Sequence, residues 1–530
     1  MTKPRVLISD SMSSQAVTVF EERGVDVVQS SKLSEAELFE MIGEFDGLAI
    51  RSSTNVTAEL LEHASNLKVV GRAGIGVDNV DVPACTRRGI VVMNTPLGNA
   101  ITTAEHAMAM MLALARHIPQ ANSSTHAGKW EKSRFMGMEL TGKLLGLIGA
   151  GNIGSIVASK AIGYGLHVQA YDPYLTEERA ARLGVKKVDL DTLLANSDIV
   201  SLHVPKTPET TNIISASAIN KMKPGSMLIN CARGGLVDEL ALLAALKSEH
   251  LKGAALDVYE VEPARDNPLF ELENVICTPH LGASTIEAQE KVAIQIAEQI
   301  SDYLVSGAIN NAINAPSISA EEAQVLRPYL QLAQCLGSFV GQLTQDPIKT
   351  LTVTYGGEAN DLNVSPLTVQ VVQSILEHHS SYVNSVNARE VARDRNINVI
   401  EAHNEGRDEY PCRITVGVET ESRSRSICGT LIQNRPRVID VKGIPLESKL
   451  GEHMLYITND DKPGVIGDIG SSTAERGINI ANMHLGRDRR NGKAMVLLEI
   501  DESLGNEDLE HLRSLPNINN VRYLHFPALQ

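Results

Sequence analysis

The chain lacks the features of secreted, membrane-spanning and nucleic-acid-binding proteins. Its six cysteines are scattered without a C-x-x-C pair, and no leader precedes the first strand-like run, so we expect reduced thiols and a cytoplasmic location. The most apolar stretch, residues 107–115, is about half of the ~20 residues that a bilayer requires, which predicts a buried helix. A net charge of −16 disfavours a nucleic-acid partner. We expect neither membrane contact nor a metal site.

The length of 530 residues predicts several domains, and 43% hydrophobic with 21% charged residues is typical of a globular protein. Short apolar runs alternate with helical or turn-rich stretches in two series, which predicts an α/β protein with doubly wound parallel sheets. The strands predicted in the first series are residues 6–8, 25–28, 47–50, 68–70 and 90–93. Those of the second series, which starts near Asn99, are residues 144–148, 167–171, 198–203, 227–230, 254–258 and 275–277.

The sequence after residue 285 contains fewer indications of function. A long helix over residues 285–305 is followed by a Ser-, Ala- and Asn-rich stretch, and a domain boundary is expected near Ala320. Residues 321–450 mix helical and strand patterns without a motif that indicates chemistry. The order βαββαβ predicts a split ferredoxin-like unit, with strands at 453–458, 478–486, 494–500 and 521–525 and helices at 465–475 and 506–515. Its topology alone favours a regulatory role and a stabilising one equally.

A glycine motif predicts a dinucleotide site. Gly149, Gly151 and Gly154 follow one predicted strand and open a helix, where they allow a tight turn, close approach of a pyrophosphate and helix packing. Such turns also connect strands to helices without any ligand. Asp172 ends the next strand about 20 residues on, and a carboxylate there binds ribose hydroxyls and disfavours a 2′-phosphate, so NAD is favoured over NADP. The alternative is a turn residue before Pro173.

Three polar residues that each follow a predicted strand suit alcohol oxidation. Arg233 can hold a carboxylate in two places, and His280 can remove a hydroxyl proton as hydride leaves. Glu262 can orient the imidazole and stabilise its charged form. A single Arg, His or Glu is more often structural, so the prediction depends on all three meeting at one edge of the sheet.

Four segments, GAGNIG at 149–154, NCARGGLVD at 230–238, DVYEVEP at 257–263 and TPHLGAST at 278–285, resemble the D-2-hydroxyacid dehydrogenase family. The resemblance covers residues 1 to about 315 and implies a Rossmann-type NAD domain, residues 99–289, inserted in a flavodoxin-like substrate domain, residues 1–98 and 290–315. It gives Arg233, Glu262 and His280 the catalytic roles. The residues that it implies at the NAD site are Gly149, Gly151, Asn152, Ile153, Gly154, Asp172, Cys231, Ala232, Asp257, Gly282, Ala283 and Ile75.

Within that family, the loops at Arg51 and at Arg72 with Gly74 are similar to those that hold the substrate phosphate in phosphoglycerate dehydrogenases. A third basic residue would be Lys132 or Arg134. The resemblance implies oxidation of 3-phospho-D-glycerate to 3-phosphohydroxypyruvate, the first step of L-serine biosynthesis. The alternatives are a glyoxylate or hydroxypyruvate reductase with the same catalytic residues and a non-enzymatic NAD-sensing protein.

The C-terminal segment resembles an ACT domain over residues 452–530, which follows an α+β intervening regulatory domain over residues 320–450. The resemblance implies a serine effector that contacts Asp461 and Asn479, and a homo-oligomer, either a dimer or a tetramer. The apolar residues 107–115 also suit a dimer interface.

Overall fold

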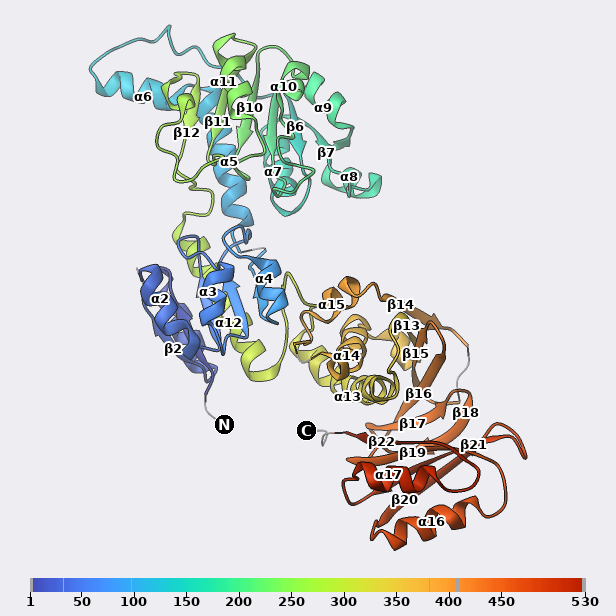
Figure 1. The fold of residues 1–530 in the computed structure, drawn as a ribbon. Helices are drawn as coiled ribbons and strands as arrows, with labels where there is room; N and C mark the ends of the chain where they lie inside the picture. The colour runs from blue at the N-terminus through green and yellow to red at the C-terminus, as the bar shows by residue number, and fades with distance from the viewer. Residues whose placement is uncertain (1–2, 32, 97, 381, 407–408, 527–530) are drawn as a thin grey trace.

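The computed structural model describes residues 3–31, 33–96, 98–380, 382–406 and 409–526. Its four β-sheets follow one another along an elongated molecule, with a seven-stranded sheet at one end and a four-stranded sheet at the other (Figure 1). The α/β class predicted from the sequence is confirmed. Within the described ranges, no helix is both long enough and apolar enough to pass through a membrane.

The first sheet is parallel throughout, in the order β2-β1-β3-β4-β5. Its strands are β1 (Arg5–Ile8), β2 (Asp26–Gln29), β3 (Gly47–Ile50), β4 (Val69–Arg72) and β5 (Val91–Met93). Its helical segments are α1 (Ser14–Glu22), α2 (Glu35–Met41), η1 (Ile42–Glu44), α3 (Ala58–His63) and α4 (Val82–Arg87). All five strands predicted from the sequence are confirmed, within two residues at each end.

A distant helix completes this first lobe. Helix α12 (Ile286–Ser306), predicted at 285–305, packs beside α1 on the sheet. A side chain at Gly71 would meet Ile300 at 2.5 Å, so glycine there lets the helix approach the strands closely. The first lobe is thus built from two segments of the chain, which lie before and after the segment that forms the second sheet.

The second sheet is also parallel, in the order β12-β11-β10-β9-β6-β7-β8. Its strands are β6 (Leu144–Ile148), β7 (His167–Tyr171), β8 (Lys186–Lys187), β9 (Ile199–Leu202), β10 (Ser226–Asn230), β11 (Leu251–Leu256) and β12 (Val275–Cys277). The helical segments are α5 (Ala100–Ala115), α6 (Ile118–His126), α7 (Asn152–Gly163), α8 (Glu177–Leu183), α9 (Leu190–Asn196), α10 (Ala216–Lys221), α11 (Glu239–Lys247) and η2 (Pro268–Glu271). Only the two-residue β8 was not predicted.

Helix α5 is buried by its own chain. Ala107, Met111 and Leu114 pack against α7 and the second sheet, which explains why residues 107–115 are so apolar. The prediction of a buried helix is confirmed. Its apolar character is no longer an argument for a dimer interface, because the monomer already covers most of it.

The third sheet is mixed, in the order β14-β13-β15-β16-β17-β18, with only β13 and β14 parallel. Its strands are β13 (Ile348–Gly357), β14 (Asn398–Asn404), β15 (Cys412–Thr420), β16 (Ser424–Ile432), β17 (Arg435–Val441) and β18 (Ile444–Ser448). Its helical segments are α13 (Ala320–Leu343), η3 (Glu358–Asp361), α14 (Ser365–Leu376), η4 (Glu377–His379) and α15 (Ala388–Asp394). The region is therefore α+β.

The fourth sheet is antiparallel, in the order β20-β21-β19-β22. Its elements are β19 (His453–Asp460), α16 (Val465–Glu475), β20 (Ile480–Arg487), β21 (Lys493–Ile500), α17 (Asn506–Arg513) and β22 (Ile518–His525). The predicted order βαββαβ is confirmed. One face of this sheet packs on α13, where Phe339 contacts Tyr456 at 5.9 Å and Phe526 at 6.4 Å between ring centroids. The third and fourth sheets thus share one hydrophobic core.

Candidate active site

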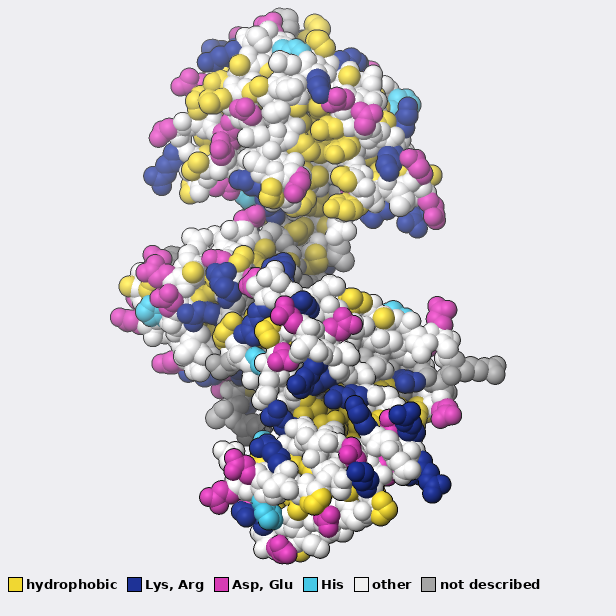
Figure 2. All heavy atoms as spheres, turned by 45° about the vertical axis from the view of Figure 1, so that its right-hand side comes forward, with side chains coloured by type: hydrophobic (Ala, Val, Ile, Leu, Met, Phe, Trp, Pro, Cys, Tyr) yellow, Lys and Arg dark blue, Asp and Glu magenta, His cyan; other side chains and the backbone are white. Residues whose placement is uncertain are grey.

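The candidate site lies at the carboxyl edge of the second sheet. Because β6, β7, β10, β11 and β12 are parallel, the loops that follow them emerge at the same edge, where doubly wound folds bind ligands. The molecule narrows to a hollowed waist, here called the cleft, between this lobe and the rest of the chain (Figure 2). Asp78 of the first lobe bonds to Arg233 of this lobe, so the two lobes are in contact at this edge.

The glycine turn has the shape that a dinucleotide requires. Gly149 has φ +95°, and a Cβ there would lie 2.5 Å from the carbonyl oxygen of His203. A Cβ at Gly154 would lie 2.1 Å from the oxygen of Gly149, whereas no described heavy atom comes within 4 Å of one at Gly151. The two outer glycines are thus needed for packing, and the middle one leaves open space for a ligand.

Helix α7 is also left ready for an anion. Side chains of Thr176, Asp189, Ser215 and Asp238 cap the helices α8 to α11, but within the described chain no side chain caps α7, which begins after Gly151. Its first backbone N–H groups, which include those at Asn152 and Ile153, are therefore free to bind a pyrophosphate. The residues present fit NAD.

Asp172 follows β7 and contacts the same turn. Its Oδ2 accepts a hydrogen bond from the Ala150 N–H at 2.9 Å, and its Oδ1 accepts one from the Tyr174 N–H at 2.8 Å. The second bond is the turn contact that the alternative interpretation expected. The first bond places the carboxylate against the glycine turn, so the two interpretations are compatible.

The loop after β10 is held by a buried amide. Asn230 donates to the carbonyl of Arg233 at 2.9 Å and accepts from the Ala232 N–H at 3.1 Å. Cys231 and Ala232 are buried. A Cβ at Gly234 would lie 1.6 Å from the Tyr259 oxygen, so this loop touches the next one directly. The arginine is thus carried on a short, braced loop.

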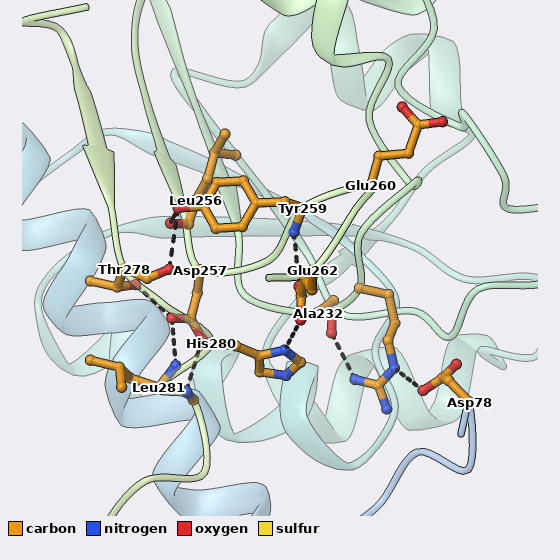
Figure 3. A network of polar contacts seen from close by, with 12 residues as sticks. Asp78, Ala232, Leu256, Asp257, Tyr259, Glu260, Glu262, Thr278, His280 and Leu281 are labelled. Atoms are coloured by element: carbon orange, nitrogen blue, oxygen red, sulfur yellow. Dashed lines mark hydrogen bonds and ion pairs between the residues drawn. The ribbon is translucent and has the colours of Figure 1, made fainter. Parts of the chain in front are cut away.

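Glu262 and His280 form a direct pair. The imidazole Nδ1 lies 2.6 Å from Glu262 Oε2, while Oε1 accepts from the Tyr259 N–H at 2.9 Å (Figure 3). Burial would raise the pKa of Glu262, but the bonds from His280 and Tyr259 outweigh burial and lower it. His280 has φ +56°, an uncommon conformation that functional sites often hold. Its side chain is 49% exposed, so Nε2 remains accessible.

Asp257 fixes the loop that carries the histidine. Its fully buried carboxylate accepts from the N–H groups of Leu281 at 2.7 Å and Gly282 at 2.8 Å and from the Thr278 hydroxyl at 2.5 Å (Figure 3). His106 Nε2 lies 3.2 Å away. Ala283 continues this loop. The sequence motifs predict Asp257 at the cofactor site but contain no signal for His106. Its position on helix α5 brings it to this loop.

The first lobe contributes two arginines. Arg51 follows β3, and its N–H donates to the buried Asp10 carboxylate at 2.6 Å, as do the N–H groups of Ser53 and Thr54. Arg72 ends β4, and its buried Nε has no partner among the described residues. Burial, and then the charge of Arg233, lower the pKa of Arg72 to about 10. A buried guanidinium nitrogen without a hydrogen-bond partner is suited to binding an anion.

Hydrogen bonds fix the backbone of Gly74 and Ile75, which follow Arg72 in the chain. The Gly74 carbonyl accepts from the Thr95 N–H at 3.0 Å, and the Ile75 carbonyl accepts from the Asn94 side chain at 2.5 Å.

One ion pair crosses the cleft between the lobes. Arg233 Nε donates to Asp78 Oδ2 at 3.1 Å, and Nη1 donates to the Ala232 carbonyl at 2.7 Å (Figure 3). The backbone at Gly76 packs against this guanidinium, because a Cβ there would lie 2.1 Å from Nη2. Asp78 was not among the predicted site residues. The only signal was its place at the end of the glycine-rich loop at 71–78.

Other predicted residues lie in local contacts. Arg134 binds Glu273 through two 2.7 Å bonds and Glu131 at 3.1 Å. Asp461 accepts from Arg487 at 3.0 Å and from the Asn491 N–H at 2.9 Å. The Asn479 side chain donates to Asp501 at 2.6 Å. Within the described part of the chain, no hydrogen bond joins Asp461 to Asn479.

Family models match two parts of the chain. The model "D-isomer specific 2-hydroxyacid dehydrogenase, NAD binding domain" matches residues 108–282, and the model "D-3-phosphoglycerate dehydrogenase intervening domain" matches residues 325–442. A solved D-lactate dehydrogenase from Aquifex aeolicus, complexed with NAD and lactic acid, is 28% identical with a TM-score of 0.53, covering 59% of this chain and 100% of that one. The fold and the site therefore define an enzyme of the D-isomer specific 2-hydroxyacid dehydrogenase class, and the predicted cofactor, NAD, is confirmed.

Full-length relatives narrow this class. The D-3-phosphoglycerate dehydrogenase of Synechocystis sp. is 43% identical over 98% of this chain and 94% of its own length. That of Archaeoglobus fulgidus is 41% identical over 98% of this chain and 99% of its own. The chain belongs to the D-3-phosphoglycerate dehydrogenase family, as its sequence motifs predicted.

Proposed function

We propose that the protein oxidises 3-phospho-D-glycerate to 3-phosphohydroxypyruvate with NAD, the first step of L-serine biosynthesis. The observation that carries the proposal is a group of three arginines near the loop that carries the His280–Glu262 pair: after burial, the charges of Arg233 and Arg51 lower the pKa of Arg72. A 2-hydroxy acid with a phosphate is an anion at both ends, which suits several guanidinium groups better than a singly charged acid does.

The cofactor would lie along the carboxyl edge of the second sheet and accept the hydride. The support is the open glycine turn, the uncapped α7 and the carboxylate of Asp172 beside them. We assign to this site the residues that contact or build the surrounding loops: Gly149, Gly151, Asn152, Ile153, Gly154, Asp172, Cys231, Ala232, Asp257, Gly282, Ala283 and Ile75. Of these, Asp257 acts through its hold on the loop at Leu281 and Gly282.

His280 is the general base. As the C2–H bond of the substrate breaks and its electron pair leaves as hydride, Nε2 takes the proton of the C2 hydroxyl, and the C2–O bond becomes a carbonyl. Glu262, ionised at neutral pH, stabilises the imidazolium through Nδ1. Arg233 uses its fork to hold the substrate carboxylate and polarise the adjacent oxygen.

The phosphate group would be held by the first lobe. Arg72 offers an unpartnered Nε, and the N–H groups around Arg51 are fixed by Asp10. Gly74 supplies a backbone position beside Arg72. Closure of the two lobes would bring these groups and Arg233 around one substrate and exclude water from hydride transfer.

A substrate panel tests the proposal. NADH formation is measured with 3-phosphoglycerate, glycerate and lactate, and in reverse with glyoxylate and hydroxypyruvate. We expect a kcat/KM for the phosphorylated acid at least tenfold above the others. A preference for the unphosphorylated acids would indicate a glyoxylate or hydroxypyruvate reductase, and binding of NAD without turnover of any acid would indicate a sensor.

We also propose a division into domains and an assembly. The four sheets and their covering helices support a substrate domain at 1–98 and 290–315, an NAD domain at 99–289, an intervening domain at 320–450 and an ACT domain at 452–530. Trp130 and Met136 are 87% and 77% exposed, which supports a homo-oligomer, a dimer or tetramer. Serine would be the effector, at Asp461 and Asn479. Six free thiols support a cytoplasmic location.

A further inference from the structure

The fourth sheet carries two imidazoles and a carboxylate that the proposed reaction does not use. Glu452 immediately precedes β19, His453 is the first residue of β19, and His525 ends β22. One donor atom from each residue lies within 4.8 Å of the others. His453 Nε2 and Glu452 Oε1 are 4.0 Å apart. These three residues, here called the His–His–Glu cluster, lie far along the chain from the catalytic histidine.

The register of the sheet brings the two histidines together. His453 and His525 lie directly opposite each other on neighbouring antiparallel strands. The Phe526 N–H donates to the Glu452 carbonyl at 2.9 Å, so the next pair along, His453 and His525, is of the non-hydrogen-bonded type, whose side chains approach most closely. Their rings stack with centroids 5.4 Å apart and planes inclined by 27°.

Neighbouring groups fix both histidines from outside the cluster. His453 Nδ1 lies 2.6 Å from the Tyr523 hydroxyl. When Nδ1 donates its proton to this oxygen, Nε2 carries the lone pair, which is the arrangement that metal-ligating histidines commonly have. On the outer edge of β22, Gln342 accepts from the His525 N–H at 2.9 Å and donates to the His525 carbonyl at 3.0 Å. The strand that carries His525 is thus tied to α13.

We propose that the His–His–Glu cluster binds a divalent transition-metal ion of the Zn²⁺ type. Two imidazoles and one carboxylate suit Zn²⁺ and its neighbours rather than Mg²⁺ or Ca²⁺, which prefer all-oxygen sites. Metal bonds of about 2.0–2.2 Å require donors roughly 3.4 Å apart in a tetrahedron. Rotation of the exposed Glu452 and His525 side chains closes the remaining gap, and water completes the coordination.

The position of the cluster gives the ion a structural effect. It joins the first residue of β19 to the last residue of β22, and β22 is held by Gln342 on the helix that shares the core of the third and fourth sheets. Bound metal therefore stabilises the C-terminal sheet where it meets α13. Because ligand binding to the folded state alone raises stability, metal should raise the thermal midpoint of this part of the chain.

Metal titration of the full-length, untagged, chelator-treated protein tests the site. Zn²⁺ is titrated in competition with a chromophoric chelator, and Co²⁺ is followed by its visible absorption. We expect one equivalent per chain with high affinity, and no competition by Mg²⁺. Tyr523→Phe should weaken binding about 10- to 100-fold, the usual cost of losing such an outer partner, and His525→Ala should weaken it at least as much.

Matched variants separate this site from other histidines. His511→Gln, on helix α17 beside the same sheet, and His280→Ala, which removes the His280–Glu262 pair, should each retain the tight equivalent. Glu452→Gln, an exposed substitution that leaves the strands paired, should lose most of the affinity and the Zn²⁺-dependent rise in thermal midpoint. Equal binding by the wild type, Glu452→Gln and His525→Ala would show an adventitious ion only and overturn the proposal, as would no binding by the wild type.

Discussion

The edge of the second sheet and the fourth sheet use polar side chains in opposite ways. At the edge of the second sheet, buried residues that do not react, Asn230 and Asp257, take up the backbone N–H and carbonyl groups of the loops. They leave His280 Nε2 exposed. In the fourth sheet, Asp461 and Asn479 are occupied by exposed neighbours. Where buried side chains already form the hydrogen bonds that the backbone of a loop needs, an exposed polar side chain on that loop is free to take part in a reaction.

The largest expected effect comes from removing the base at the braced edge. His280→Ala should lower kcat by about 10²-fold or more, because general-base catalysis is typically worth that much, while NAD affinity stays nearly unchanged. Steady-state kinetics and NAD titration measure the two quantities. His167→Gln, an exposed histidine of the same lobe, is the matched control. Near-normal turnover by His280→Ala would contradict the assignment.

Arg72→Gln should have the next largest effect, and only for a phosphorylated substrate. Loss of a charged hydrogen bond costs about 1.5–3 kcal/mol, which corresponds to roughly 10- to 150-fold in kcat/KM for 3-phosphoglycerate. The value for glycerate should change much less. Arg88→Gln, an exposed arginine at the end of α4, should leave both values unchanged. An equal loss for both substrates would remove Arg72 from the phosphate site.

Asp257→Asn tests whether the buried carboxylate of Asp257 stabilises the loop that carries His280 at the edge of the second sheet. Burial would raise the pKa of Asp257, but bonds from His106, Thr278 and the Leu281 N–H lower it below its usual 3.8. Because the unfolded state takes the proton first as pH falls, the stabilisation is present above about pH 4 and is lost as pH drops through the folded pKa.

The substitution should therefore lower the thermal midpoint by an amount equivalent to about 1–3 kcal/mol near neutral pH. The difference from the wild type should shrink as the pH falls below about 4. Calorimetry over that range measures it. A difference that is constant or grows in acid would show that the carboxylate is not the stabilising form.

Asp78→Asn should have a smaller effect, since the pair that it forms with Arg233 across the cleft is partly exposed. Such pairs are worth about 0.2–1 kcal/mol, so kcat/KM should fall by roughly 1.4- to fivefold, and less at high salt. Kinetics at two ionic strengths check this. A loss as large as that of His280→Ala would mean that Asp78 acts in the reaction itself.

The same contrast explains what could be predicted from the sequence. Parallel strands bury both faces, so their apolar runs are continuous and easily recognised, and the residues after β10, β11 and β12 necessarily share an edge. The pair between Nδ1 of His280 and Glu262, and the ion pair of Arg233 with Asp78, depend on loop conformations that no periodicity encodes. The order of the strands therefore predicted which residues lie at the edge, but it did not predict that Arg233 contacts Asp78 across the cleft.

The C-terminal half was harder to predict for a related reason. The third and fourth sheets share one core, so that Phe339 on α13 packs on Tyr456 and Phe526, more than one hundred residues away. The alternation of each strand shows which face is buried but not its partner. Likewise, the pairing of His453 with His525 follows from a register between the first and last strands of the sheet. No local pattern indicates that register.

The smallest effect is expected for a substitution at the surface of the fourth sheet. Asp461→Asn removes an exposed ion pair with Arg487, and exposed substitutions usually change stability by no more than about 0.5 kcal/mol, so basal kcat should change by less than about twofold. If serine is the effector and Arg487 releases Asp461 to receive it, any response of the wild type to serine should disappear in Asp461→Asn and persist in Glu510→Gln, an exposed substitution on α17. An unchanged serine response in Asp461→Asn would place the effector elsewhere. If serine does not affect the wild type, Asp461 has only the role of an ion-pair partner of Arg487 at the surface.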